Sequence, residues 1–329
     1  MRISGFTFCK NADKLYYPIK QSIQSILPIV DEFIVNIGDC DDDDKTVELI
    51  KSINSPKIKI IFSEWNLEKY PNGTENAHQT DIAKNACSGD WLFYLQADEV
   101  VHEKYLYNIV KCCEKLIDNK DIEGLLFDYV HFYGDYWHYQ NSHGWYKKEI
   151  RIIRNDPDIH SWESAQSFRR IQNFDGVHYR QQEGTFKLKV AKVNAAIYHY
   201  GWVRPPELMQ KKKLALDTIH KGKNIALDNN KNVEIFAYAP LGTLPVFKDT
   251  HPAVMNDWIK NFNWQDKLNY SKKPSANYKK PSKRHRILTK IEKIFFKNKI
   301  SIGEFKNYKL ILSCDKKIKN VNSYNKCIM

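Results

Sequence analysis

The sequence lacks the long apolar runs that a membrane span requires. Its apolar stretches are short and interrupted by charged residues, whereas a span needs ~18 to 20 uncharged residues. The N-terminal segment MRISGFTFCKNADKLYYP holds one Arg, and it has neither an extended apolar region nor a small-residue cleavage site. A signal peptide is therefore not predicted, and we expect a cytoplasmic protein.

The sequence also lacks cysteines at the spacings that are typical of disulfide frameworks or zinc sites. The seven cysteines form an odd set in which no two have the C-x-x-C spacing. Neither a disulfide framework nor a zinc site is predicted from such spacing, and reduced thiols agree with a cytoplasmic location.

Two common catalytic motifs are absent. The first predicted strand leads into FCKNADK, which has no G-x-G-x-x-G turn, so a Rossmann dehydrogenase or methyltransferase is disfavoured. No G-x-S-x-G elbow occurs either, which disfavours a serine hydrolase of the usual α/β type.

Positive charge is what the sequence has in excess, and it is concentrated near the C-terminus. The net charge is +12, and from Gln265 onward there are 18 Lys and Arg against 4 Asp and Glu. We therefore predict a catalytic domain over residues 1–264 and a basic extension over residues 265–329. A basic extension favours an anionic partner, either nucleic acid or an acidic membrane surface.

The N-terminal third alternates strand and helix patterns. Strands are predicted at RISGFTFCKN, EFIVNIGD, KIKIIFSEW and DWLFYLQAD, with helices from Pro18, from Thr46 and over residues 76–87. Such alternation predicts an α/β fold with a mainly parallel sheet and helices on both faces. Parallel sheets bind ligands beyond the carboxyl ends of their strands, a rule that places these residues along one rim: Asn11, Asn36, Asp39, Trp65 and Asp98.

The remaining segments differ in character. After a helix over residues 103–116, the strands GLLFDYVHFYG and KKEIRIIRN predict a mixed extension of the sheet. Residues 162–202 are rich in His, Tyr, Gln and Arg with few helix signals, and a helix is predicted over residues 207–220. Residues 269–282 resemble a linker.

The segment GDWLFYLQADEV delivers Gln96, Asp98 and Glu99 to the exit of an apolar strand. Together with the strand leading to Asn11, the helix at Pro18 and the loop NIGDCDDDDKT, it resembles family 2 glycosyltransferases of the GT-A fold. The resemblance is specific over residues 1–100 and looser beyond. It implies a nucleotide-sugar-binding half over residues 1–100 and an acceptor side over residues 101–264.

The resemblance implies a metal site. In that family the strand ends in Asp-x-Asp, whose carboxylates hold Mg²⁺ or Mn²⁺ against the charged diphosphate of the donor. Here the triplet is Gln96-Ala97-Asp98, so Asp98 is expected to carry the metal with help from Glu99. His199 in AAIYHYGWVR matches a later His that the family brings to the metal or diphosphate. A helix cap for Asp98 and a core histidine for His199 are the alternatives.

Other polar residues are candidates for donor binding. Asn36 stands where the family carries an acid that reads the nucleoside, so either Asp39 or Asn36 itself would take that role. Residues 39–44 equally fit a solvated loop that caps the helix at Thr46. Arg204 and Lys211–Lys213 offer positive charge to the diphosphate, although the lysines also fit a solvated helix face.

An inverting transfer needs a carboxylate that takes the proton of the acceptor hydroxyl. Glu163 in HSWESAQSFRR is the leading candidate for this base, followed by Asp128 and Glu183. An ion pair between Glu163 and the nearby arginines is the alternative. Four aromatic residues are candidates for sugar stacking or for the core: Trp145, Trp162, Trp202 and Tyr200.

The sequence therefore predicts a glycosyltransferase that moves a sugar from a nucleotide-diphosphate donor to a glycan, lipid-linked or other hydroxyl acceptor. The alternative is a catalytically inactive domain of this fold that binds nucleic acid or a membrane surface through its basic extension. Nucleic acid is not the expected partner, because the chain has no base-reading motif. Residues 283–298 predict a basic amphipathic helix suited to the inner face of a membrane, or one packed on the domain. Its apolar side would comprise Ile287, Leu288, Ile291, Ile294 and Phe295.

Overall fold

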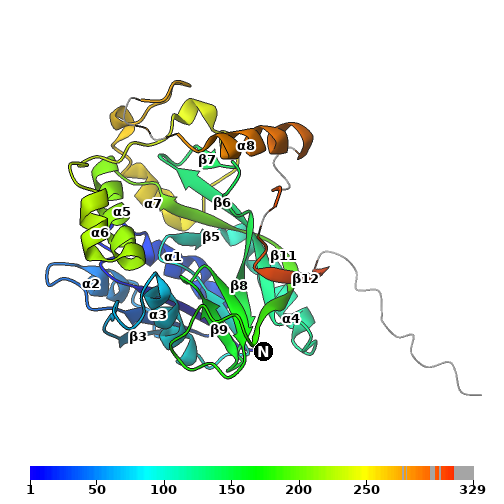
Figure 1. Cartoon of the computed structure of the whole chain (residues 1–329). Helices are drawn as coiled ribbons and strands as arrows, with labels where there is room; N and C mark the ends of the chain where they lie inside the picture. Colours follow the sequence, from blue (N-terminus) through cyan, green and yellow to red (C-terminus); the bar gives the residue numbers. More distant parts are fainter. Residues whose placement is uncertain (276–277, 279, 297–300, 304, 315–329) are drawn as a thin grey trace, which may run out of the picture.

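The computed structural model describes residues 1–275, 278, 280–296, 301–303 and 305–314. The described chain is a mixed α/β structure in which helices surround a curled central sheet of twelve strands (Figure 1).

The N-terminal third forms the parallel part of the sheet. Its elements are β1 (Ile3–Cys9), α1 (Ile19–Ile26), η1 (Leu27–Ile29), β2 (Glu32–Ile37), α2 (Thr46–Lys51), β3 (Ile58–Phe62), α3 (Thr74–Asn85) and β4 (Trp91–Tyr94). The strands lie in the order β3-β2-β1-β4, and each neighbouring pair is parallel. The predicted βαβ alternation is confirmed over this region.

Alternation of side chains along the strands explains the helices on both faces. Phe33, Val35 and Ile37 of β2 point into one core with Ile23 of α1, whereas Ile34 packs in a second core. Successive side chains of a strand point to opposite faces, so a strand that is apolar throughout must be covered on both sides. The helix α1 covers one face and α3 the other.

The second half extends the sheet with mostly antiparallel pairs. It comprises β5 (Glu99–Val101), η2 (Glu103–Tyr105), α4 (Leu106–Leu116), β6 (Gly124–Tyr133), β7 (Tyr139–Gln140), β8 (Lys148–Arg154), β9 (Ile159–Trp162), β10 (Ser167–Ile171) and β11 (Thr185–Trp202). From β4 the order continues β8-β6-β11-β10-β9, in which only β6 and β11 are parallel. The predicted mixed extension is present, and most of residues 162–202, the stretch with few helix signals, forms strands.

The C-terminal part consists of helices and one further strand. They are α5 (Pro206–Lys221), α6 (Lys223–Asn229), η3 (Leu241–Thr243), η4 (Ala253–Met255), α7 (Asn256–Lys260), η5 (Gln265–Lys267), α8 (Lys283–Phe296) and β12 (Tyr308–Ser313). The strand β12 pairs in parallel with β11, and the last residues of the predicted helix 283–298 lie outside the described residues. The domain boundary near residue 264 stays a prediction. No helix in the described part of the chain has the length and apolar character of a membrane span.

One expectation about cysteine is wrong. Cys112 of α4 and Cys314, which follows β12, form a disulfide with their Cα atoms 5.9 Å apart. The two residues are separated by 202 positions in the sequence, so only the pairing of β12 with β11 brings them together. Sequence spacing carries no information about such a contact.

Candidate active site

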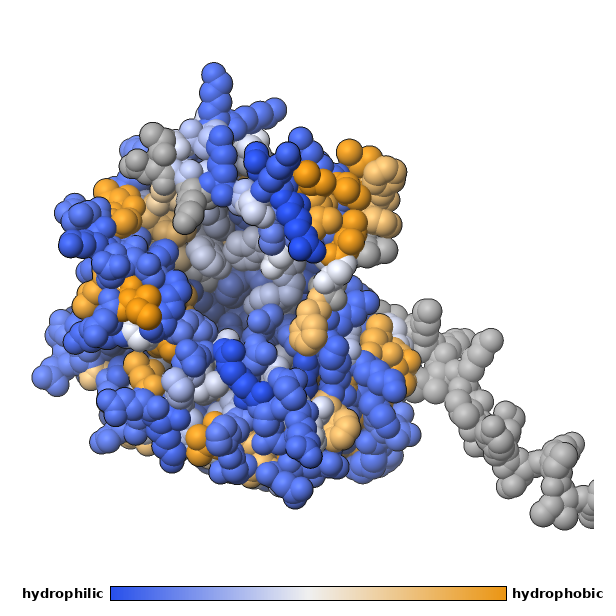
Figure 2. All heavy atoms as spheres, in the orientation of Figure 1, coloured by the Kyte–Doolittle hydropathy of each residue, from blue (hydrophilic) through white to orange (hydrophobic). Residues whose placement is uncertain are grey.

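A cavity of about 590 Å³ lies beyond the carboxyl ends of β1 and β4. Figure 2 shows the molecular face that is hollowed near its middle, with α5 and α6 along one side of the hollow. The cavity is lined by residues from four parts of the chain, including Asn11 after β1, Asp98 after β4, His199 of β11 and Lys212 of α5. Its volume is in the usual range for small-molecule sites.

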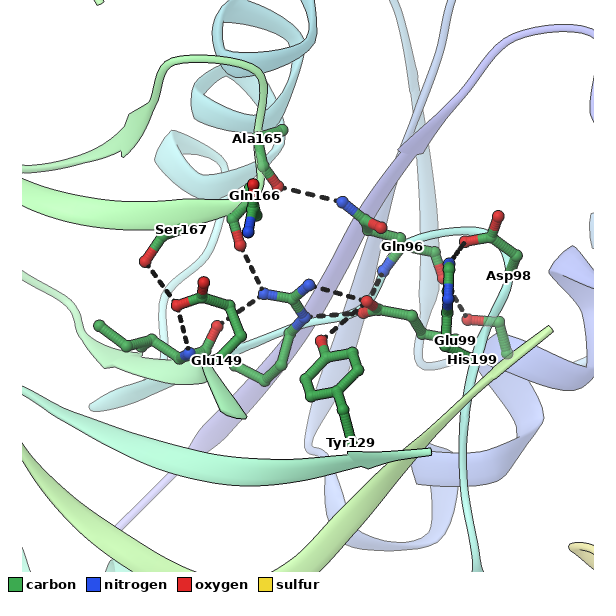
Figure 3. Close-up of polar contacts among 12 residues, drawn as sticks. Gln96, Asp98, Glu99, Tyr129, Glu149, Ala165, Gln166, Ser167 and His199 are labelled. Carbon is green, nitrogen blue, oxygen red and sulfur yellow. Dashed lines mark hydrogen bonds and ion pairs between the residues drawn. The ribbon is translucent and has the colours of Figure 1, made fainter. Parts of the chain in front are cut away.

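Asp98 is the carboxylate that the buried strand β4 delivers to this cavity. Its side chain is 6% exposed; Oδ2 accepts a hydrogen bond from Lys212 Nζ at 2.8 Å, and Oδ1 lies 3.6 Å from His199 Nε2 (Figure 3). Burial raises the pKa of Asp98, but the charge and hydrogen bond of Lys212 outweigh burial and hold the pKa well below its ordinary value. Asp98 is therefore ionised at neutral pH.

The protonation of His199 follows from its partner His131. His131 Nε2 lies 2.7 Å from the Tyr146 carbonyl oxygen and must donate to it, because a carbonyl only accepts. Burial lowers the pKa of His131 to about 3 and that of His199 to about 4, so both rings are neutral near pH 7. His131 Nδ1 is then the acceptor of the 2.9 Å bond from His199 Nδ1. His199 Nε2 consequently directs a lone pair toward Asp98 Oδ1.

Asp98 Oδ1 and His199 Nε2 are two electron-pair donors that face each other without a proton between them, an arrangement that is suited to binding a cation. Carboxylate oxygen and imidazole nitrogen are both ligands of Mn²⁺, and Mg²⁺ binds through one or two carboxylates plus substrate phosphates. Two side chains leave coordination positions for the oxygens of a diphosphate. In the described ranges no group of three or more His, Cys, Asp or Glu has a metal-binding arrangement, so the protein ligands of such a site would be Asp98 and His199.

Gly201 keeps this space open. A Cβ atom at position 201 would lie 2.5 Å from His199 Nε2 and 2.7 Å from Asp98 Oδ2. Such distances are shorter than van der Waals contact, so any side chain here would displace the two groups. This steric restriction explains why glycine occupies position 201, in the HYGW segment.

Glu99 does not join this set, although it was expected to help to hold the metal. Its carboxylate forms two 2.7 Å hydrogen bonds with Arg151 and accepts a third from the Tyr129 hydroxyl (Figure 3). Both side chains of the Glu99–Arg151 pair are fully buried. Glu99 thus neutralises Arg151 beneath the site and does not line the cavity.

The residues expected near the nucleoside separate into two groups. Asn11 lines the cavity, and Asp39 contacts its wall by accepting hydrogen bonds from Lys10 Nζ at 2.6 Å and Trp65 N at 3.0 Å. Asn36 is fully buried and donates to Gln79 Oε1 at 2.7 Å. Asn36 is not part of the cavity lining.

Gln96 and Arg204 both approach the site but in different ways. Gln96 lines the cavity and donates from Nε2 to the Ala165 carbonyl at 3.1 Å (Figure 3). Arg204 is fully buried against the ring of Tyr17, which lines the cavity, with 4.8 Å between the guanidinium carbon and the ring centroid. Arg204 Nη1 donates to Leu15 O, whereas Nε and Nη2 have no hydrogen-bond partner within the described structure.

The three candidate bases lie in different places. Glu163 is exposed at the turn between β9 and β10, with φ of 56°, and its neighbour Ser164 lines the cavity. Asp128 pairs with Lys192 at 2.7 Å, and Glu183 is exposed before β11. None of the three carboxylates lines the cavity itself, and only Glu163 has a chain neighbour that does. Left-handed backbone at a residue other than glycine is uncommon and is found often at functional sites.

The aromatic candidates divide between the cavity and the core. Trp145 and Trp202 line the cavity with ring centroids 5.6 Å apart. Tyr200 stacks on Phe132 inside an aromatic core, and Trp162 is buried beside Arg169.

Sequence reasoning missed two cavity residues, His131 and His220. It named Lys212 only together with Lys211 and Lys213, as positive charge for the diphosphate or as part of a solvated helix face. A signal for Lys212 was present, because it begins a stripe at helical spacing that continues with the apolar residues Ala215, Leu216 and Ile219. All four line the cavity.

No protein-family model matches the chain, and no curated protein matches it. Several solved structures are similar. A crystal structure of S. aureus TarS 1-349 in complex with UDP is 15% identical with a TM-score of 0.35, over 69% of this chain and 68% of that one. A second TarS structure is 12% identical with a TM-score of 0.36, and this chain spans only 44% of its length.

Glucosyl-3-phosphoglycerate synthase from Mycobacterium tuberculosis, in complex with Mn²⁺, UDP and phosphoglyceric acid, is 19% identical with a TM-score of 0.27. That match covers 40% of this chain and 43% of the synthase. At these identities and TM-scores the likenesses carry no argument about activity, so a proposed function rests on the residues of the cavity.

Proposed function

We propose that the chain is a GT-A-type glycosyltransferase of family 2 character. It takes a sugar from a nucleotide-diphosphate donor and transfers it with inversion to a hydroxyl acceptor, either a glycan or a lipid-linked sugar. The observation that carries this proposal is the pair of facing electron donors, Asp98 Oδ1 and His199 Nε2, at the exit of β4 inside the cavity.

In this proposal the donor lies along the cavity from the β1 exit to α5. Asn11, Asp39 and Trp65 would contact the nucleoside, and Gln96 would fix the turn that holds Ala165 beside the sugar. Asp98 and His199 would hold Mn²⁺ or Mg²⁺, which stabilises negative charge on the diphosphate as the nucleotide leaves. Arg204 would add positive potential from its buried place behind Tyr17.

Glu163 is the proposed base. The acceptor oxygen forms its bond to the anomeric carbon of the sugar, the bond from that carbon to the diphosphate breaks, and the hydroxyl proton passes to the Glu163 carboxylate. The nucleoside diphosphate leaves on the opposite side, which inverts the anomeric centre. Support comes from the position of Glu163 on a turn whose next residue lines the cavity.

A panel of nucleotide sugars tests the proposed class. Thermal shift with UDP-, GDP- and CMP-sugars, each with Mn²⁺ or with EDTA, should show stabilisation by the UDP- or the GDP-sugars, more strongly with Mn²⁺, and not by the CMP-sugars, which carry a single phosphate. Stabilisation by none of the nucleotides in either condition would remove the proposal. The panel uses the full chain and needs no knowledge of the acceptor.

Substitution of the base separates binding from chemistry. Glu163→Gln should bind the stabilising nucleotide as the wild type does, while transfer falls by ~10²- to 10⁴-fold, because a general base acts in the transition state. Glu183→Gln is the matched control, since Glu183 is also exposed but, unlike Glu163, has no chain neighbour that lines the cavity. Transfer near the wild-type rate in Glu163→Gln would pass the role to another group.

We further propose that α8 rests on an anionic membrane surface. Its outer side combines exposed apolar residues with basic ones, and Figure 2 shows this apolar patch beside strongly hydrophilic side chains. The exposed apolar residues of the helix are Ile287, Ile294, Phe295 and Phe296, and its basic residues are Lys283, Arg284, Arg286, Lys290 and Lys293. A basic helix with an exposed apolar side is typical of membrane-surface docking.

Vesicle binding tests the α8 proposal. The full chain should sediment with vesicles that contain phosphatidylserine, less so as salt rises, and little with purely zwitterionic vesicles. Ile294→Glu should abolish sedimentation, whereas Val233→Glu, at an exposed apolar residue outside α8, should not. Sedimentation that is independent of lipid charge would contradict the proposal.

A further inference from the structure

Lys212 lies inside the cavity in direct contact with Asp98. It is only 6% exposed, and its Nζ donates one hydrogen bond to Asp98 Oδ2 and one to the Gly201 carbonyl, both at 2.8 Å. An ammonium group has three N–H donors. Two are used in this way, and the third makes no hydrogen bond within the described structure. Nζ also lies 4.8 Å from the centroid of the Tyr17 ring, and both residues line the cavity.

The charges around the exit of β4 do not add up to an acid-rich metal site. Gln96 is neutral, and Glu99 is fully engaged with Arg151. Asp98 is the carboxylate that lines the cavity, and Lys212 neutralises it. Arg204 adds a second buried cation, and its Nε and Nη2 have no hydrogen-bond partner in the described structure. In the described part of the site, the two cations Lys212 and Arg204 therefore outnumber the one carboxylate, Asp98, even without a divalent ion.

Fold stability alone does not account for a lysine at this position. A buried ion pair contributes little compared with a well-packed apolar pair of similar volume. The cavity-facing residues that follow in α5, including Ala215 and Leu216, are apolar, so an apolar residue at 212 would continue the same stripe. The lysine also binds only Oδ2 of Asp98 and leaves Oδ1 directed toward His199.

We infer that Lys212 is a built-in cation of the donor site. It donates its remaining N–H to the diphosphate of the nucleotide sugar, while a divalent ion shares Asp98 from the Oδ1 side. The inference rests on the proposed function, because the diphosphate is its ligand. Its consequence is that the site still binds the diphosphate when the divalent ion is removed. Lys212 is responsible for this remaining affinity.

Calorimetric titration with UDP and with inorganic pyrophosphate tests this role. The wild type should bind both in EDTA, and Lys212→Met should weaken binding there by ~10- to 100-fold, the effect of one or two charge-assisted hydrogen bonds. In Mn²⁺ the loss should be smaller, because the ion then supplies most of the charge. Lys213→Met is the matched control, since Lys213 pairs with Asp217 at 2.7 Å and does not line the cavity.

A second pair of variants guards against an effect on folding, since Lys212→Met leaves Asp98 buried without its partner. Asp98→Asn alone should keep UDP binding in EDTA, and Asp98→Asn combined with Lys212→Met should lose it. Equal binding by these two variants in EDTA would overturn the inference. So would a Lys212→Met loss of the same size in Mn²⁺ and in EDTA, which would mean that Lys212 only positions Asp98.

The test also distinguishes this inference from the proposed function. Wild-type binding of UDP or GDP in Mn²⁺ but not in EDTA would overturn the role of Lys212 and leave the glycosyltransferase proposal standing. Absence of wild-type binding to UDP, GDP and pyrophosphate in both conditions would remove both.

Discussion

At the scale of single residues, the site depends on hydrogen-bond partners that fix protonation. The Tyr146 carbonyl fixes the ring of His131, and His131 in turn fixes His199 with its lone pair on Nε2. Groups behind a ligand of this kind orient it and raise its basicity. His131 is thus a positioning residue for His199, because both of its ring nitrogens are already engaged in hydrogen bonds.

Replacement of His131 tests this chain of bonds. His131→Phe removes the acceptor for His199 Nδ1–H, so Mn²⁺ affinity should fall by ~10- to 100-fold, while UDP binding in EDTA changes little. Titration of Mn²⁺ followed by electron paramagnetic resonance measures the affinity. His178→Phe is the control, because the His178 side chain is 74% exposed. Equal Mn²⁺ affinity in both variants would show that His131 has no such role.

Some site residues could be predicted from the sequence, because their neighbours mark them. Asp98 follows a run of five apolar residues, and an acid at the end of such a strand is conspicuous. His131 was missed and Lys212 was not separated from Lys211 and Lys213, because the contacts of His131 with His199 and of Lys212 with Asp98 join segments that are distant in sequence. The acid Glu99, next to Asp98 in the sequence, was expected to help it to hold the metal. The structure separates them, because Arg151 from a distant strand pairs with one of the two.

At the scale of elements, a single buried carboxylate links neighbouring strands of the parallel part of the sheet near their N-terminal ends. Glu32 of β2 accepts 2.7 Å hydrogen bonds from Ser4 of β1 and from Ser88, and it pairs with Lys59 of β3 at 2.6 Å. These bonds outweigh the effect of burial and lower the pKa of Glu32 to about 2. Three segments of the sheet are therefore connected through one ionised side chain.

The lowered pKa predicts a pH-dependent contribution to stability. A carboxyl whose pKa is lower in the folded state stabilises the fold above its unfolded pKa, and this stabilisation is lost as pH falls through the folded pKa. Glu32→Gln should cost ~1 to 3 kcal/mol at pH 7. The difference from wild type should shrink as the pH falls from about 4.5 to about 2.

Urea unfolding at a series of pH values measures this difference. Glu48→Gln is the control, because Glu48 is exposed on α2 and its replacement should have little effect at any pH. A Glu32→Gln cost that is the same at pH 7 and at the acid end would contradict the account.

The elements themselves were predicted with unequal success. Regular βαβ alternation revealed β1 to β4, since each strand is a short apolar run between helical patterns. The long strand β11 was only partly expected, because Thr185–Ala195 alternates charged and apolar residues without clear boundaries. Its conformation is fixed by pairing with β6, β10, β5 and β12, which are distant in sequence.

At the scale of the whole molecule, the Cys112–Cys314 disulfide connects the end of β12 to α4. It closes a loop of 202 residues, and a disulfide over a long loop typically stabilises the folded state by ~2 to 4 kcal/mol. Dithiothreitol should therefore lower the urea midpoint of the wild type. Cys314→Ser should show the lower midpoint under both conditions. Identical midpoints for oxidised and reduced wild type would contradict the stabilising role.

The whole molecule also shows why composition alone could not place the C-terminal region. The excess of positive charge after Gln265 predicted an extension, yet β12 is a strand of the same sheet and α8 packs on the domain. His143 pairs with the buried Glu292 of α8 at 2.8 Å. Charge indicates the partner that a surface prefers, whereas the position of the chain depends on contacts that composition does not encode.

The central claim is that Asp98 and His199 hold a divalent ion against the diphosphate of a nucleotide sugar. Calorimetric titration of UDP and GDP, with Mn²⁺ and with EDTA, on wild type and Asp98→Asn tests it most directly. Mn²⁺ should tighten wild-type binding of one nucleotide by at least ~10-fold, and Asp98→Asn, folded and still able to accept the bond from Lys212, should lose that gain. An Asp98→Asn protein that keeps the full gain from Mn²⁺ would contradict the account.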